Sequence, residues 1–195
     1  MGCLDVSDER EGDPQKVMDA NPGEKTRYFG LDGVENSRMM QAAHAATLQR
    51  CSEEKALDPA YEPVSLPTIP QLRMTRRLQG RYTLDAAEEG KHFPESVGMT
   101  GDWRKSGPVY ELPAGILYCG AVENLFAAGR CVSVTESMWD ITRVIPGCAV
   151  TGQAAGTAAA LLSLRGRWEI GELQAALIRD GALLHLRDAK PPIVR

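Results

Sequence analysis

The stretch from Val122 to Leu164 constrains this chain most, because it joins a short apolar run to a long alanine-rich segment. Residues 125–128 read Leu-Phe-Ala-Ala and are stopped by Gly129, a pattern typical of a buried strand in a parallel sheet. From Thr151 to Leu164 the chain has no proline and many good helix formers, which predicts a helix. The sequence therefore predicts a strand, a loop and a helix in that order.

Small residues crowd the first turns of this predicted helix: Gly152, Ala154, Ala155, Gly156 and Ala158. The first N–H groups of a helix have no partner inside it, and the helix dipole favours negative charge at that end. One interpretation is therefore a helix start whose backbone presses against a flat, partly anionic cofactor. The alternative is a helix whose glycines only allow close packing against a neighbouring element.

Three runs in this region resemble the C-terminal signature of FAD-dependent oxidoreductases: Asn124–Cys131 (Asn-Leu-Phe-Ala-Ala-Gly-Arg-Cys), Arg143–Pro146 (Arg-Val-Ile-Pro) and Thr151–Ala160 (Thr-Gly-Gln-Ala-Ala-Gly-Thr-Ala-Ala-Ala). The resemblance runs from about Ile69 to the C-terminus. It implies a glutathione-reductase-like fold, in which a strand ending in Ala-Gly passes the flavin ribityl chain. The next helix then points its N-terminus at the flavin pyrimidine ring. The expected fold class is α/β, the C-terminal part of a Rossmann-like FAD-binding domain with an attached irregular α+β segment.

The resemblance also implies roles for particular residues. Gly129 and Arg130 are expected to line the ribityl and pyrophosphate side of FAD. The helix start is expected to bind the flavin, largely through backbone N–H groups, with Gly152, Gln153, Ala154, Ala155 and Gly156. Arg143 precedes this helix and is the expected catalytic residue, where a guanidinium can bind a substrate carboxylate or stabilise an oxyanion. The alternative for Arg143 is a salt bridge to Glu136 or Asp140.

One hallmark of such a domain is missing. A FAD-binding domain of this type normally starts with a strand, Gly-x-Gly-x-x-Gly and a helix that holds the pyrophosphate. No Gly-x-Gly-x-x-Gly occurs in the 195 residues. The sequence thus resembles only the C-terminal portion of the family, and a partner chain is one possible source of the first half.

Two functions remain open at this point. The first is an FAD-dependent oxidoreductase that transfers electrons or hydride between the flavin and a small organic substrate. The second is a non-catalytic remnant or interaction subunit that binds no cofactor alone.

Composition argues against several other classes. The net charge of -4 gives no reason to expect nucleic acid or an anionic membrane as partner. The apolar stretch from Cys148 to Leu164 is interrupted and falls short of a ~20-residue membrane span. The first residues show no apolar signal core, so a cytoplasmic location is expected. Five cysteines without a Cys-x-x-Cys pair and three scattered histidines predict neither a disulfide framework nor a metal site.

The chain is predicted to have three parts: an N-terminal polar segment with a helix and a proline-rich connection (residues 1–70), a substrate-side β-rich segment (71–118), and the C-terminal part of the FAD-binding domain (119–195). The helix of the first part is expected from Arg38 to about Leu57, capped by Asn36 or Ser37. A last helix is predicted from Glu169 to Arg179, ended by Gly181.

Strands of the middle part are predicted at Gln71–Leu84, Val109–Pro113 and Gly115–Tyr118. Asp85 can begin a short helix, and Gly98 and Gly101 are interpreted as turns. Arg73 and Arg76 either lie on a solvated strand face or approach an anionic substrate. His92 carries useful chemistry, but its position predicts no role.

Overall fold

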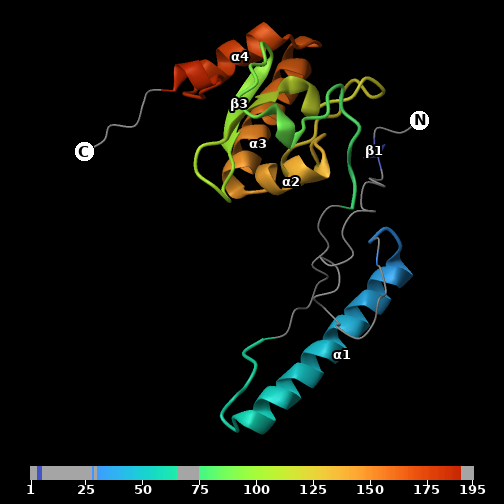
Figure 1. Ribbon diagram of the computed structural model, residues 1–195. Helices are drawn as coiled ribbons and strands as arrows, with labels where there is room; N and C mark the ends of the chain where they lie inside the picture. Colours follow the sequence, from blue (N-terminus) through green and yellow to red (C-terminus); the bar gives the residue numbers. More distant parts are fainter. Residues whose placement is uncertain (1–3, 6–27, 29, 66–74, 190–195) are drawn as a thin grey trace. The chain divides into compact units, whose positions relative to one another are not determined.

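The computed structural model describes residues 4–5, 28, 30–65 and 75–189 (Figure 1). Arg73 and the first residues of the predicted strand Gln71–Leu84 lie outside the described residues. The chain divides into two compact units, one formed by Met1–Val6 with Arg76–Arg195 and the other by Ser7–Thr75. Each unit is therefore a separate body with its own elements.

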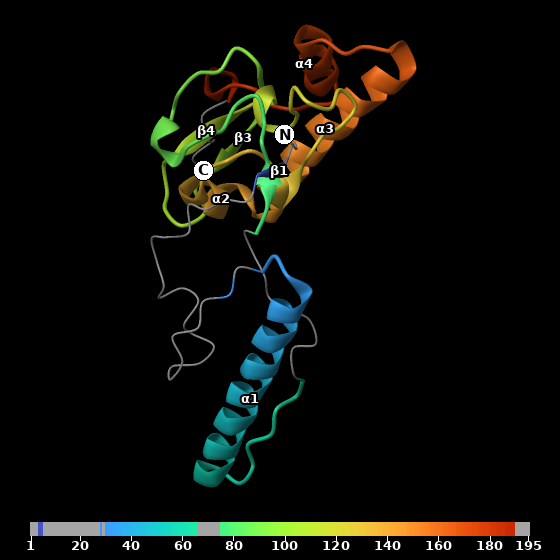
Figure 2. The ribbon, with the colours of Figure 1, turned by 90° about the vertical axis from the view of Figure 1, so that its right-hand side faces the viewer.

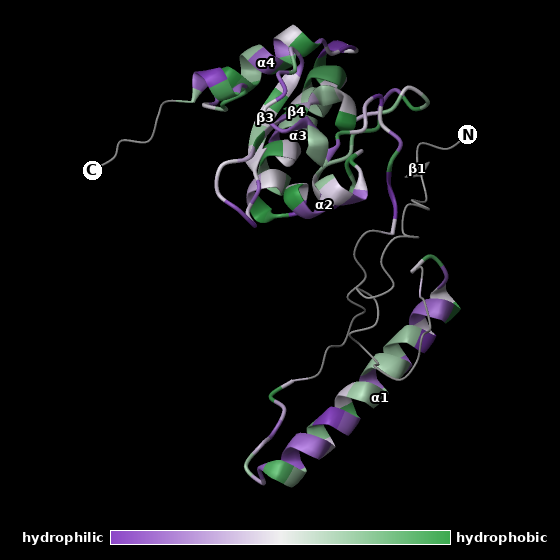
Figure 3. Ribbon diagram, in the orientation of Figure 1, coloured by the Kyte–Doolittle hydropathy of each residue, from purple (hydrophilic) through white to green (hydrophobic). Residues whose placement is uncertain are grey.

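The unit Ser7–Thr75 contains one long helix, α1 (Gly33–Leu57). Asp32 caps it, because its carboxylate accepts the backbone N–H groups of Val34 and Glu35 at 3.0 and 2.9 Å. The helix therefore begins before the predicted Arg38, whereas its predicted end at Leu57 is confirmed. None of its residues is buried, and Figure 3 shows hydrophilic and hydrophobic residues mixed along its length.

The other unit is built on a β-hairpin of β3 (Ser96–Gly101) and β4 (Val109–Pro113). The strands are antiparallel, with Met99 opposite Glu111, and a register irregularity lies between Ser96 and Met99. The prediction of β4 is confirmed. The prediction of turns at Gly98 and Gly101 is wrong, because both residues lie in β3. At Gly98, glycine allows a close approach between two segments of the chain, since a Cβ there would lie 2.2 Å from Val150 Cγ1.

The helix that approaches Gly98 is α3 (Ile145–Arg165), the longest element of this unit. It begins before the predicted Thr151, because Pro146 lies in its first turn, where a missing N–H costs nothing. It ends at Gly166, which has a left-handed φ of 70°. Figures 1 and 2 both show α3 alongside β3. The buried residues of α3 are Gly147, Thr151, Ala154, Ala155 and Ala158.

The length of α3 corrects a further expectation. Ile145–Arg165 is long and apolar enough to cross a bilayer by length and composition alone. Core helices of soluble proteins pass the same test, and Ala154, Ala155 and Ala158 of α3 are buried beneath neighbouring elements. About 28% of this apolar stretch is buried, and a single helix of this kind is weak evidence for a membrane span.

The expected parallel sheet is not what the described residues form. They contain two antiparallel two-stranded sheets, β1 (Leu4–Asp5) with β2 (Arg77–Leu78), and β3 with β4. The strand predicted at 125–128 is wrong: Leu125 is 39% exposed, and Phe126 forms only an isolated antiparallel bridge with Tyr118. A strand of a parallel sheet lies between other strands, whereas this run is covered in part by Tyr118 and Trp168 and pairs with no parallel strand. The architecture is a mixture of helices and small antiparallel sheets, consistent with an α/β class.

Short elements complete this unit. Four are single turns: η3 (Ala86–Glu88), η4 (Ala114–Ile116), η5 (Gly129–Cys131) and η6 (Leu186–Asp188). Asp85 caps η3 as predicted. The strand predicted at Gly115–Tyr118 is wrong, because η4 takes its first two residues and Tyr118 forms only an isolated bridge.

Two helices flank α3: α2 (Glu136–Thr142) precedes it, and α4 (Ile170–Arg179) follows it. The predicted last helix is confirmed as α4, and Gly181 after it has a φ of 88°. Leu173, Ala176 and Leu177 form the buried side of α4, at the spacing of one helix face.

Cys119 in the core is disulfide-bonded, which the spacing of the cysteines did not predict.

We expect Gly98→Ala to lower the free energy of unfolding by about 1–3 kcal/mol, the usual cost of overpacking a core. The added Cβ meets Val150 Cγ1 at 2.2 Å, so the Val150 side chain or the two elements have to shift. Gly101→Ala is the control in the same strand, because its Cβ finds Pro108 O at an ordinary 3.7 Å. Urea unfolding measures both variants, and equal losses would contradict the packing role of Gly98.

Candidate functional site

The turn η5 lies against the first half of α3. Gly129 has a φ of 68°, a left-handed conformation that favours glycine. Its backbone N–H donates to Thr151 Oγ1 at 3.0 Å, and an added Cβ would lie 3.4 Å from Cys148 Sγ. The structure thus brings the Ala-Gly-Arg run of the signature against the helix that follows it in the sequence.

The N-terminus of α3 lies beside this turn, at Val144 to Gly147. Inside the helix the first ordinary bond runs from the Cys148 N–H to the Val144 carbonyl, at 2.9 Å. The N–H groups of Ile145 and Gly147 precede it and have no partner within the helix. Ile145 is 86% exposed at this end. Pro146, a residue typical of a first helical turn, was the sequence signal for this start.

This start corrects the expected role of the backbone at Gly152–Gly156. These residues lie in later turns of α3, so their N–H groups belong to the hydrogen bonds of the helix. The structure also divides them between two sides. Ala154 and Ala155 are buried, whereas Gly152, Gln153 and Gly156 are exposed. At the true start of α3, Ile145 is exposed, so its N–H is the candidate donor to a ligand, whereas Gly147 is buried.

Gly152 and Gly156 leave an open strip on the exposed side of α3. A Cβ added at either residue would meet nothing within 4 Å. Packing between the described elements therefore does not require glycine at these two positions. Glycine inside a helix costs about 1 kcal/mol relative to alanine. A ligand that approaches the backbone closely would account for that cost.

Arg143 lies between α2 and α3, close to the helix start. Its Nε donates to Asp140 Oδ1 at 2.9 Å, which is the salt bridge considered as the alternative to a catalytic role. Its guanidinium also lies 5.1 Å from the ring centre of Trp139 and 5.9 Å from that of Trp103. The side chain is thus held in place and is only 25% exposed.

Arg130 is exposed on η5, and its carbonyl accepts the indole N–H of Trp139 at 3.0 Å. Trp139 therefore connects η5 to the neighbourhood of Arg143. The structure brings together Gly129, Arg130, Arg143 and the start of α3, and it places Ala154 and Ala155 away from solvent in the core.

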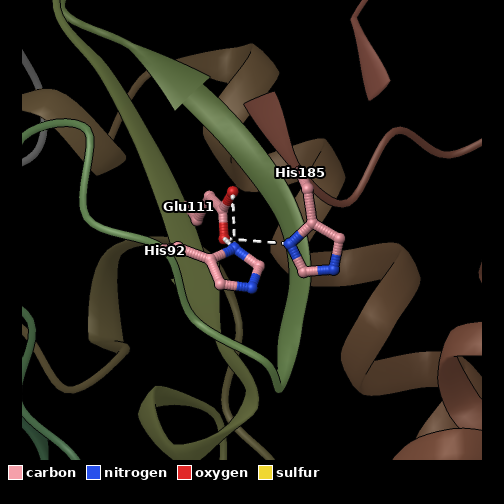
Figure 4. Close-up of side chains that lie close together, drawn as sticks. All are labelled: His92, Glu111 and His185. Atoms are coloured by element: carbon pink, nitrogen blue, oxygen red, sulfur yellow. Dashed lines mark hydrogen bonds and ion pairs between the residues drawn. The ribbon is translucent and has the colours of Figure 1, made fainter. Parts of the chain in front are cut away.

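A second group of ionisable side chains lies in the same unit, formed by His92, Glu111 and His185 (Figure 4). Nδ1 of His185 lies 2.9 Å from Glu111 Oε2, and Nδ1 of His92 lies 3.1 Å from the same oxygen. Glu111 and His185 are buried, whereas the side chain of His92 is 48% exposed. The sequence separates these residues from Glu111 by 19 and 74 positions, so spacing gave no signal.

The carboxylate of Glu111 keeps its charge although it is buried. Burial raises the pKa of Glu111. Hydrogen bonds from His185 and from the backbone N–H groups of Phe93 and Leu186 lower this pKa by more than burial raises it. These backbone bonds measure 2.8 and 3.1 Å. The net effect places the pKa at about 2, well below its ordinary value of 4.5. Glu111 is therefore a carboxylate at neutral pH.

Comparison with known proteins assigns the family. The family model of FAD dependent oxidoreductases matches residues 8–180, which is most of the chain and begins well before Ile69. The chain belongs to the FAD-dependent oxidoreductases, and FAD is the cofactor of that family. No curated protein and no solved structure matches it.

The residues present fit one part of FAD. The start of α3 offers the backbone N–H group of the exposed Ile145, and the strip at Gly152 and Gly156 can lie against a flat ring. The sequence has no Gly-x-Gly-x-x-Gly, the run that holds the pyrophosphate in dinucleotide-binding domains. Among the described residues, the only parallel strand contact is the isolated bridge between Leu84 and Val134. The described residues therefore offer candidate contacts for the flavin end of the cofactor.

The depressed pKa of Glu111 predicts a specific loss of stability in acid. Because the folded-state pKa is about 2 and the ordinary value is 4.5, the stabilisation is present above about pH 4.5 and is lost between that pH and about 2. As the pH falls through this window, we expect the free energy of unfolding of the wild type to drop by on the order of 1–3 kcal/mol more than that of Glu111→Gln. Urea unfolding at several pH values measures the difference.

The control for this experiment is Glu123→Gln, a substitution at an exposed glutamate. Its stability should follow the wild-type pH curve throughout. A Glu111→Gln curve parallel to the wild type would show that Glu111 does not carry the acid sensitivity.

Proposed function

We propose that this chain forms the flavin-facing, C-terminal portion of a glutathione-reductase-like FAD-dependent oxidoreductase. Its reaction transfers electrons or hydride between the flavin and a small organic substrate. The observation that carries the proposal is the contact of Gly129 with Thr151 and Cys148, which sets the signature turn beside the start of α3. The family match over residues 8–180 supports the flavin chemistry.

The start of α3 would stabilise the negative charge of the reduced cofactor. Bound FAD supplies the two-electron chemistry, and negative charge gathers on its pyrimidine side when it is reduced. The N–H group of Ile145 and the dipole of α3 favour such charge. A helix N-terminus contributes up to ~2 kcal/mol, which is about 40 mV for a two-electron couple. The helix would therefore tune the potential of the flavin without setting it alone.

Arg143 would bind an anionic group of the substrate next to this helix start. Its Nε is committed to Asp140, and the planar guanidinium carries four further N–H donors. The rings of Trp103 and Trp139 keep the guanidinium in one orientation. A fixed orientation is what two parallel hydrogen bonds to a carboxylate require. The salt bridge to Asp140 thus positions Arg143 and is compatible with a catalytic role.

Residues outside these 195 would bind the adenosine end of FAD. A partner chain, or the remainder of a longer protein, would supply the strand, the glycine-rich turn and the helix that hold the pyrophosphate. The alternative is a remnant that binds no flavin, and binding measurements separate the two directly.

The isolated chain should bind FAD and FMN weakly and with similar affinity, within about threefold. Only the isoalloxazine ring and the ribityl chain find contacts, so the adenosine half of FAD adds nothing. Quenching of flavin fluorescence during titration measures both constants. FAD binding 100-fold tighter than FMN would reveal a pyrophosphate site and overturn the proposed division. Absence of binding by either would favour the remnant.

The open strip on α3 makes a second prediction. Gly152→Ala should raise the melting temperature by about 2–4 °C, because alanine is worth up to about 1 kcal/mol more than glycine in a helix. The added methyl group should also weaken FMN binding at least tenfold, because it holds the ring away from the backbone. Gly171→Ala in α4 is the matched control, since a Cβ there also meets nothing within 4 Å. It should stabilise the fold and leave FMN affinity unchanged; the same result for Gly152→Ala would remove Gly152 from the flavin site.

A further inference from the structure

We propose that His92, Glu111 and His185 form a binding site for a divalent transition-metal ion such as Zn²⁺. The three residues come from separate segments: His92 lies between η3 and β3, Glu111 in the middle of β4, and His185 just before η6 (Figure 4). Two imidazoles and one carboxylate are ligands that zinc and similar ions accept in proteins. This site is separate from the residues assigned to the flavin.

The distances suit an ion held between the three side chains. The ligand atoms lie within 4.8 Å of one another, and both Nδ1 atoms lie 2.9–3.1 Å from Glu111 Oε2. Ligands bound at about 2.1 Å in a tetrahedral arrangement are separated by roughly 3.4 Å. A small opening of the cluster therefore makes room for a metal, and the exposed ring of His92 can supply that movement.

The backbone already fixes the carboxylate for this purpose. Phe93 follows His92, and its N–H donates to Glu111 Oε2 at 2.8 Å; Leu186 follows His185, and its N–H donates to Oε1 at 3.1 Å. Each histidine segment thus provides one ring nitrogen and one backbone donor to the same carboxylate. Carboxylates that bind metals are commonly held by such hydrogen bonds.

The burial of the three side chains differs in a useful way. Glu111 and His185 are buried, which shields an ion from bulk water, whereas the half-exposed His92 leaves a path from solvent. Three protein ligands leave a fourth position for water, as in open zinc sites. Nitrogen ligands also discriminate against Mg²⁺ and Ca²⁺, which prefer oxygen.

Zinc and cobalt titrations of the full chain test the site. The protein is freed of metal with a chelator, and its thiols are alkylated because Cys51, Cys131 and Cys148 are free competing ligands. We expect one equivalent of Zn²⁺ by calorimetry, a higher melting temperature, visible absorbance bands with Co²⁺, and no response to Mg²⁺. The absence of saturable Zn²⁺ or Co²⁺ binding would overturn the proposal and leave a hydrogen-bonded structural cluster.

Substitutions locate the ion. His92→Ala should weaken Zn²⁺ binding at least tenfold while the melting temperature of the metal-free protein stays nearly unchanged, because this side chain is half exposed. His185→Ala should weaken binding similarly, although it also removes a buried hydrogen bond. His44→Ala in α1 replaces the third histidine of the chain and should bind Zn²⁺ like the wild type. Wild-type affinity in His92→Ala, or a loss only in His44→Ala, would contradict the assignment.

Discussion

The close packing of α3 on β3 is the interaction on which the larger unit depends. Gly98 has no side chain, and Val150 of α3 occupies the space that a Cβ would need. Ala154, Ala155 and Ala158 continue the buried side of the helix with small side chains. Because protein interiors are close-packed, this contact fixes the distance between the helix and the hairpin.

The same contact sets the geometry of the candidate flavin site. Burying one side of α3 turns Thr151 inward, where its hydroxyl accepts the N–H of Gly129 and donates to the Gly147 carbonyl at 2.8 Å. Gly147 in turn packs so closely on Thr142 that a Cβ would lie 2.6 Å from the Thr142 carbonyl oxygen. The turn η5, the end of α2 and the start of α3 are therefore positioned together. The opposite side of α3, with Gly152 and Gly156, stays open.

Glu111, in the middle of β4, plays a comparable part in the same hairpin. Its carboxylate lies on β4 and receives hydrogen bonds from both the segment before β3 and the segment after α4. Charge-assisted bonds of this kind are about twice as strong as neutral ones. Segments that are far apart in sequence are thus joined by one buried charge, whether or not a metal ion takes the place of the direct contacts.

Local chemistry in the sequence determined several features by itself. The end of α1 at Leu57, the strand β4, the helix α4 and its stop at Gly181 follow from periodicity and from glycine and capping residues. The signature runs also indicated the flavoprotein family, which the family match confirms. These signals work because each depends on residues that are neighbours along the chain.

Tertiary contacts decided the remainder. Gly98 was interpreted as a turn, yet it lies within β3. Glycine is needed there because Val150, on a helix distant in the sequence, occupies the space of a Cβ. The run at 125–128 lacks neighbouring strands to bury it, so it forms no parallel strand. His92, Glu111 and His185 meet only after the hairpin and the segment after α4 come together. Spacing along a chain encodes local periodicity, whereas such meetings depend on how whole elements pack, and packing is decided only in three dimensions.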